Sequence, residues 1–153
     1  MTVTMEEVRA AVEPDEPDYP GAAARLGAAA LPFLAELIRG DDPSLASKAA
    51  SLAGIIDGTE SLEVLSEAGR SPQVVVRIAA SAAIGQLKDL PITDLLISLL
   101  EDENPYVRKV ALDSAGSVRA MGAARKIRSL AEQDPEQFVR EVAQETQRLL
   151  GTE

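Results

Sequence analysis

Charged residues of opposite sign recur at a fixed separation in this sequence of 153 residues. Asp102 precedes Arg108 by six residues, and Asp134 precedes Arg140 by the same separation. A carboxylate beside a guanidinium could form a charged binding site or an internal ion pair. Because the pair returns along the chain, we favour a structural role. The residues assigned to this charged set are Asp41, Arg77, Asp102, Arg108, Asp134 and Arg140.

An apolar residue stands two positions before Arg77, Arg108 and Arg140, and before Ser47, which takes the place of the arginine in one segment. The four residues are Leu45, Val75, Tyr106 and Phe138, which include two of the four aromatic residues in the chain. On a helix this position lies at the border of the buried stripe. The row could therefore offer anchors to a partner or pack between helices. The polar neighbours that would form its rim are Lys48, Lys109, Asp113 and Glu141.

The composition excludes several kinds of catalytic chemistry. The sequence has no His, Cys or Trp, so zinc sites with the usual ligands, Ser-His-Asp and Cys-His nucleophiles and disulfides are excluded. Phosphate loops, dinucleotide-binding glycine motifs and EF-hand loops are also missing. We therefore expect no catalytic residues, no metal, no cofactor and no enzymatic activity.

The charge distribution restricts the partners. The net charge is −10, and such a chain repels a phosphate backbone. Residues 1–76 carry a net charge of −8, whereas residues 77–153 carry −2. This asymmetry could attract different partner surfaces to the two ends or allow weak self-association, but solvated faces are its simpler explanation. We expect a protein partner, no nucleic acid, and a monomer or a weakly self-associating chain.

An internal repeat indicates which structural elements would position these residues. The residues at the arginine position are 47, 77, 108 and 140, and a glycine recurs downstream at 27, 54, 85 and 116. Two independent markers thus share a period of about 31 residues. Ser47 replaces the arginine in one unit, and Ser71 replaces the aspartate in another.

Each unit is predicted to contain two helices. The first carries leucines at helical spacing, a turn with Asp or Ser and Pro follows, and the second ends near the recurring glycine. We expect one domain over residues 1–153, all-α, with about five helix pairs. The expected units are 4–27 (degenerate), 29–56, 59–86, 91–118 and 121–150.

The repeated pattern of leucines, Asp, Pro, Val-Arg and Ala with a downstream Gly resembles a HEAT repeat. The short period is similar to the HEAT-like repeats of phycobilisome lyases. The resemblance covers about residues 29–150 and implies a right-handed α-α superhelix, a HEAT-like solenoid. It also implies that the charged set forms a ladder between adjacent repeats and that partners bind along the concave surface of the second helices.

The expected function is therefore a non-catalytic protein–protein interaction or scaffold module. The alternative is an accessory subunit of an enzyme similar to a bilin lyase. Metal-dependent HEAT-like hydroxylases need His-Glu ligand pairs, which a chain without His lacks. A HEAT-like fold that reads damaged DNA would need a basic face, which the net charge of −10 opposes.

The ends of the chain and its apolar stretches bear on location. The N-terminus has acidic residues where a signal peptide needs basic ones. The longest apolar run contains Pro32 and stops at Glu36, so no membrane-spanning helix is predicted. The last helix is polar, as expected of a terminal repeat that faces water. We expect a small, complete, cytoplasmic protein that does not contact a membrane.

Overall fold

The computed structural model describes residues 2–87 and 89–153, and the ordered elements in these ranges are all helical. The helices are α1 (Met5–Val12), α2 (Tyr19–Leu26), α3 (Leu31–Arg39), α4 (Pro43–Ala53), α5 (Thr59–Ala68), α6 (Val74–Ala83), α7 (Thr93–Leu100), α8 (Pro105–Ser117), α9 (Ala124–Gln133) and α10 (Gln137–Leu150). Three short 3₁₀ turns complete the list: η1 (Gly27–Ala30), η2 (Ile84–Gln86) and η3 (Met121–Ala123).

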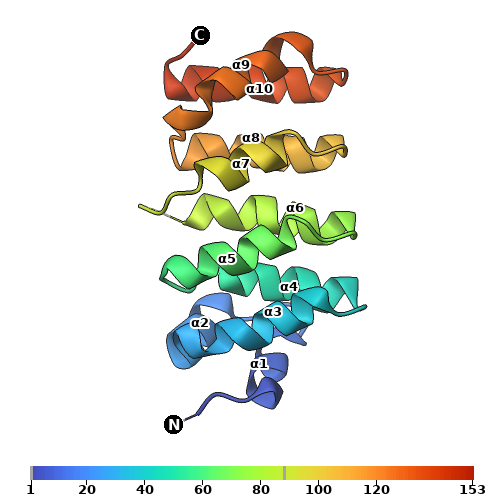
Figure 1. The fold of residues 1–153 in the computed structure, drawn as a ribbon, viewed down its shortest axis with the longest axis vertical. Helices are drawn as coiled ribbons and strands as arrows, with labels where there is room; N and C mark the ends of the chain where they lie inside the picture. Colours follow the sequence, from blue (N-terminus) through green and yellow to red (C-terminus); the bar gives the residue numbers. More distant parts are fainter. Residues whose placement is uncertain (1, 88) are drawn as a thin grey trace.

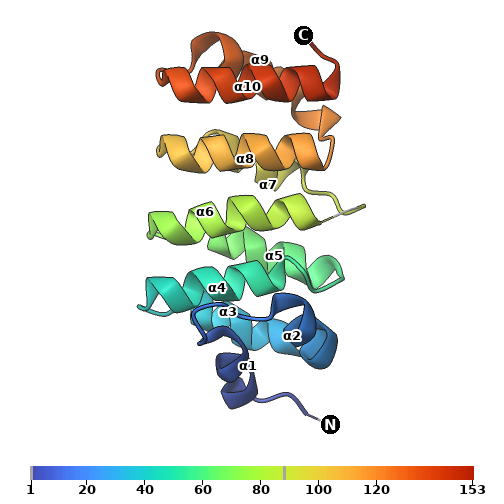
Figure 2. The same cartoon turned by 180° about the vertical axis from the view of Figure 1, so that it is seen from behind.

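The helices form a stack of pairs that rises from the N-terminus to the C-terminus (Figure 1). The odd-numbered helices α3, α5, α7 and α9 cross one side of the stack, and the even-numbered helices α4, α6, α8 and α10 lie side by side on the other (Figure 2). One helix pair falls in each of the five units expected from the sequence. The predicted α-α superhelix is confirmed.

Helix ends follow from local sequence. The hydroxyl of Thr4 accepts a hydrogen bond from the Glu7 amide, and the Glu7 carboxylate accepts one from the Thr4 amide, which completes a capping box at α1. Asp42 and Asn104 cap α4 and α8, and a proline follows each of them at the first helical position, where no amide donor is needed. These turns fix where each second helix begins.

The core runs the length of the stack and combines leucines from the first helices with alanines and larger apolar residues, such as Leu52 and Leu112, from the second. Leu34, Leu65 and Leu99 are at most 1% exposed. Ala50, Ala80, Ala111 and Ala143 are fully buried in the second helices. Small side chains let the second helices approach closely. A Cβ atom on Gly54 would lie 2.7 Å from the Ala83 Cβ, so this contact needs glycine.

One apolar segment corrects the expectation from the sequence. Tyr19–Arg39 is a run of 21 helical residues with mean hydropathy 1.4, long and apolar enough to cross a membrane. The exclusion of such a segment at Pro32 and Glu36 was therefore too strong, because proline fits the first turn of α3. Gly27 has a φ of +59° and separates α2 from α3, and Leu31, Leu34 and Leu37 are buried in the stack. The stack buries 39% of the apolar window, so packing accounts for part of its composition.

Candidate functional site

The helices α4, α6, α8 and α10 together form one face of the stack (Figure 2). Its helices lie side by side, and each offers the same sequence positions to the outside. Hydroxyl groups hold these helices together, since Ser114 Oγ donates to the Ser81 carbonyl at 2.6 Å and Thr146 Oγ1 to the Leu112 carbonyl at 3.3 Å. We call this surface the second-helix face.

An apolar row crosses the second-helix face from α6 to α10. Val75 is 51% exposed, Tyr106 is 60% exposed, and Phe138 is half-buried. The rings of Tyr106 and Phe138 stack, with centroids 5.2 Å apart and planes inclined by 28°. Offset stacking at this distance is a favourable arrangement of two aromatic rings. The row thus combines contact between repeats with a large exposed aromatic surface.

Leu45 does not belong to this row, which corrects its assignment from the sequence. Leu45 is 9% exposed and lies in the core. The residues that precede the four second helices are Asp42, Gln73, Asn104 and Glu136. Counted from these caps, Leu45 corresponds to the buried Val76 and Val107, and the exposed Ser44 takes the place in the row. The alignment on Asp41 shifted the unit by one residue.

The predicted rim residues are largely paired with neighbours. Lys109 Nζ lies 2.9 Å from Asp113 Oδ2, both on α8. Glu141 is exposed and accepts a hydrogen bond from the Gln137 side chain. Lys48 is half-buried, and its Nζ donates to the Pro14 carbonyl at 2.7 Å. Lys48 therefore ties α4 to the segment between α1 and α2.

A second line of apolar residues beside the row was missed in the sequence. Val110 and Val142 are half-buried on α8 and α10, four residues after Tyr106 and Phe138. Residues four apart lie on one side of a helix, so this periodicity could have identified them. With Ala79 on α6, which is half-buried at the equivalent position, they extend the apolar surface along the face.

The charged set connects neighbouring units. Arg77 Nε lies 2.8 Å from Asp102 Oδ2, and both side chains are 9% exposed. Arg108 repeats this bidentate contact with Asp134, at 2.8 and 3.0 Å. Arg77 and Arg108 thus each pair with the aspartate of the next unit. Within its own unit, Arg108 Nη1 donates to the Asp102 carbonyl, six residues earlier.

Each aspartate also completes the turn between its two helices. Asp102 Oδ1 accepts a hydrogen bond from the Asn104 amide, and Asp134 Oδ1 accepts one from the Glu136 amide. Arg140 Nη1 donates to the Asp134 carbonyl. The carboxylates therefore act on the turn and on the preceding repeat simultaneously, which is a structural task.

Asp41 takes no part in these contacts among the described residues. It is exposed, because the one-residue shift places Gly40 where the other units have Ser71, Asp102 and Asp134. By the same count, the buried Ala46 stands at the arginine position instead of Ser47. The ladder thus runs from α6 to α10, and its assignment to Asp41 needs correction.

The described residues contain no group of three or more His, Cys, Asp or Glu that could hold a metal ion. Within residues 2–87 and 89–153, one titratable side chain has a clearly shifted pKa: burial raises the pKa of Tyr19, and a hydrogen bond with Ser51 partly lowers it. Tyr19 therefore stays protonated at neutral pH, and its hydrogen bond with Ser51 links the start of α2 to α4. What the second-helix face provides is a regular row of apolar and aromatic side chains with charged side chains beside it.

A family model for HEAT repeats matches residues 66–147, which is more than half of the chain. No curated protein matches the sequence. Two solved structures are similar in fold. One is human deoxyhypusine hydroxylase in complex with glycerol, with a TM-score of 0.70 and 21% identity, over 80% of this chain and 44% of that one. The chain thus spans less than half of the hydroxylase.

The second similar structure is the complex of CpcE and CpcF of phycocyanin lyase from Nostoc sp. PCC7120. It has a TM-score of 0.70 and 19% identity, over 94% of this chain and 97% of that one. The similarity to this structure therefore extends over nearly the whole of both chains.

These structures correct the expectation that the chain is not an enzyme. That expectation took a stack of helix pairs and a lack of familiar motifs as signs of a non-catalytic protein. The same stack forms part of a hydroxylase and of a lyase, so the architecture gives no ground for excluding catalysis. With its matched repeats and its superhelix of short units, similar to those of the lyase, the chain belongs to the family of HEAT-repeat proteins.

Proposed function

We propose that this protein is an interaction module whose second-helix face binds a segment of another protein, with Tyr106 and Phe138 as anchors. The observation that carries the proposal is the stacked aromatic pair, which leaves Tyr106 60% exposed. Aromatic residues are enriched at the centres of protein interfaces and contribute much of the binding energy. A chain with four aromatic residues places two of them together on this face.

The surroundings of the pair are those of an interface. Val75, Val110 and Val142 extend an apolar patch around the rings. Three charged residues stand at the edge of this patch: Lys109, Asp113 and Glu141. Charged residues at the edge of an interface contribute more to the orientation of the partner than to the affinity of binding. Binding of a protein, rather than a nucleic acid or a membrane, and a cytoplasmic location stay predictions from the sequence.

The test replaces the two rings and measures capture of partners. Tyr106→Ser combined with Phe138→Ser removes the anchors. Tyr106 is exposed and Phe138 is a half-buried residue that packs against the edge of the core, so circular dichroism checks that the double variant is folded. Immobilised wild-type protein should retain partners from native lysate that the double variant loses, with mass spectrometry as the readout. Glu63→Ser is the control, because Glu63 is exposed on α5 and lies outside the face. Equal capture by a correctly folded double variant would contradict the proposal.

A second candidate function is that of an accessory subunit of an enzyme similar to a bilin lyase. The observation that favours it is the match to the phycocyanin lyase complex over 94% of this chain. The direct test mixes the purified protein with a free bilin and records the absorbance spectrum. A shifted or sharpened bilin band supports this role, and an unchanged spectrum removes it.

A further inference from the structure

The second-helix face is bounded at α4 by the segment that connects α1 to α2. Lys48 on α4 donates a hydrogen bond to the Pro14 carbonyl at 2.7 Å. The Tyr19 side chain forms a hydrogen bond with Ser51, which is three residues after Lys48 on the same helix. These two contacts hold residues 13–19 against the outward side of α4 (Figure 2). The segment therefore forms a wall at the N-terminal end of the face.

This wall carries negative charge. Four of the seven residues in the segment 13–19 are acidic and none is basic. Glu13 pairs with Arg9 of α1. Asp15 and Glu16 are exposed and form no ion pair with the residues that the structure describes. We call residues 13–19 the acidic wall, and its free carboxylates are available to a partner.

The surface beyond α4 is an apolar floor. Four residues at helical spacing face outward from α6, and all of them are apolar and exposed or half-buried: Val75, Ile78, Ala79 and Ala82. Tyr106, Phe138, Val110 and Val142 continue this apolar floor on α8 and α10. On α4, between the wall and the floor, Ser47 and Ser51 donate to carbonyls of their own helix. These hydroxyl groups therefore need no ligand, and an apolar side chain can pass over them.

The positive charges that stand beside the floor on α8 and α10 already have partners. Lys109 pairs with Asp113, and Arg148 pairs with Glu145. Glu141 on α10 is exposed and forms no ion pair within residues 2–87 and 89–153. The floor thus has free carboxylates at both ends, on the acidic wall and on α10. Such an arrangement attracts positive charge to the two ends of an apolar ligand.

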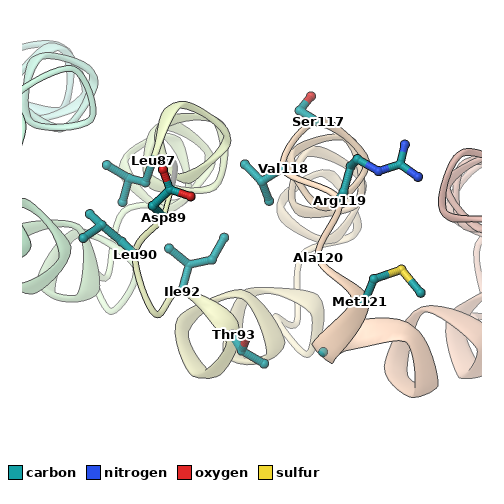
Figure 3. A pocket seen from close by; sticks show the side chains of 11 residues that line it. Leu87, Asp89, Leu90, Ile92, Thr93, Ser117, Val118, Arg119, Ala120 and Met121 are labelled. Carbon is teal, nitrogen blue, oxygen red and sulfur yellow. The ribbon is translucent and has the colours of Figure 1, made fainter.

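A hollow at the ends of the second helices has a different charge pattern. It has a volume of about 440 Å³ and lies between residues 87–93 and residues 117–122 (Figure 3). Asp89 and Arg119 both line it, so the residues described there carry both signs of charge. This hollow gives no preference for a basic or an acidic ligand, whereas the second-helix face favours a basic one.

The elements of the face also select the backbone conformation of a ligand. The floor is built from α6, α8 and α10, whose backbone amides and carbonyls are paired within each helix. An extended segment lying on such a floor would bury backbone groups without partners, which costs free energy. An α-helix pairs its own backbone groups and can present its apolar side chains on one side. The floor therefore favours a helical ligand over an extended one.

We propose that the segment bound by the second-helix face is a basic amphipathic α-helix of another protein. This inference rests on the function proposed above and names the chemistry of the partner. The apolar side of the helix covers Tyr106, Phe138 and the floor on α6. Its Lys or Arg side chains face Asp15 and Glu16 at one end and Glu141 at the other. A second copy of this chain would instead bring a further net charge of −10 to an acidic surface.

The probe is a fluorescein-labelled peptide of about 18 residues, with leucines alternately three and four residues apart and Lys and Ala elsewhere. Its binding to the full chain is measured by fluorescence polarisation at about 0.15 M salt. Three control peptides carry Glu in place of Lys, the same composition with the leucines spread around the helix, or two interior alanines replaced by proline, which breaks the helix. We expect each control peptide to bind about tenfold more weakly.

Two pairs of charge reversals decide whether the acidic wall takes part. Asp15→Lys combined with Glu16→Lys should weaken binding of the basic peptide by about tenfold, because cations then face cations. Glu36→Lys combined with Glu63→Lys is the matched control, since it changes the net charge equally at exposed positions of α3 and α5. The control variant should change the affinity by less than about twofold. Equal weakening by the two folded variants would overturn the proposal.

The aromatic anchors separate this proposal from the function on which it rests. Tyr106→Ser combined with Phe138→Ser should weaken binding of the basic peptide by about tenfold or more. The proposal is overturned if the basic peptide does not bind at about 1 mM, or if a control peptide binds equally well. Loss of lysate partners by the folded double variant would in that case still support the interaction module. Capture of the same partners by the double variant would contradict the interaction module itself.

Discussion

The two halves of the stack solve the same packing problem with different side chains. From α6 to α10, a buried arginine of each unit holds an aspartate of the next, as Arg77 holds Asp102 and Arg108 holds Asp134. From α1 to α4 the equivalent positions are Gly40 and Ala46. There the units are joined by leucine packing, small residues and the contact of Lys48 with the Pro14 carbonyl.

The difference teaches that a repeat stack does not need one type of link throughout. Solenoid stability is approximately a sum of terms within units and terms between neighbours. A buried ion pair and a close backbone approach can each supply the term between neighbours, provided that the register of the helices is kept. Substitutions that remove each type of link should therefore have different costs in the two halves.

The largest effect is expected at the centre of the ladder. Arg108→Ala leaves the carboxylate of Asp134, whose side chain is 1% exposed, buried without its guanidinium. Loss of one partner of a buried ion pair costs about 3–5 kcal/mol. Urea unfolding followed by circular dichroism measures this change in the free energy of unfolding. A cost below that of an exposed ion pair would show that the ladder does not stabilise the stack.

A series of glycine substitutions should show the second type of link. Gly54, Gly85 and Gly116 occupy the same position in three successive units. A Cβ at Gly54 meets the Ala83 backbone and Cβ, at Gly85 it meets Ser114, and at Gly116 it meets the flexible Leu149 side chain. Overpacking costs about 1–3 kcal/mol, so Gly54→Ala should destabilise most.

Gly116→Ala serves as the control of this series. It lies within α8, where alanine is favoured over glycine by about 1 kcal/mol, and Leu149 is 55% exposed and can move away. We expect this variant to be neutral or stabilised in the same urea experiment. An equal loss of stability for all three variants would contradict the view that close approach matters most near α4.

The sequence alone predicted the period of the repeat, the helix pairs and the places of Val75, Tyr106 and Phe138 in the apolar row. These follow from local signals: leucines at helical spacing, capping residues and the recurring Val-Arg. It failed by one residue in the unit that contains α4. The sequence Asp41-Asp42-Pro43 has two residues from its first aspartate to the proline, whereas Asp102 stands three residues before Pro105. Aligning on the cap that precedes the proline would have placed Leu45 in the core.

Features that depend on the packing of units could not be read from spacing. The spacing of Asp102 and Arg108 alone does not show which arginine each aspartate contacts, and the ladder between adjacent repeats was implied by the resemblance to HEAT repeats. In the structure the Asp102 carboxylate contacts Arg77 of the preceding unit.

A smaller effect is expected when the ladder is extended into the N-terminal half. Ala46→Arg alone inserts a charge at a buried position and should be destabilising. Adding Ser71→Asp supplies the carboxylate at the place that Asp102 has in the next unit. The double-mutant cycle should give a favourable coupling of about 1 kcal/mol between the two substitutions. Strict additivity would show that the ladder geometry does not extend to α4.

The smallest effect is expected for exposed ion pairs, and it should be the same in both halves. Arg9 in the last turn of α1 pairs with Glu13, which caps that helix, and Lys109 pairs with Asp113 on α8. The side chains are about half exposed in both pairs. Both pairs have the cation N-terminal to the anion, the weaker orientation on a helix. Arg9→Ala and Lys109→Ala should each change the free energy of unfolding by less than about 0.5 kcal/mol. If Lys109→Ala were as costly as Arg108→Ala, the number of charges in the C-terminal half, and not their burial in the ladder, would explain its stability.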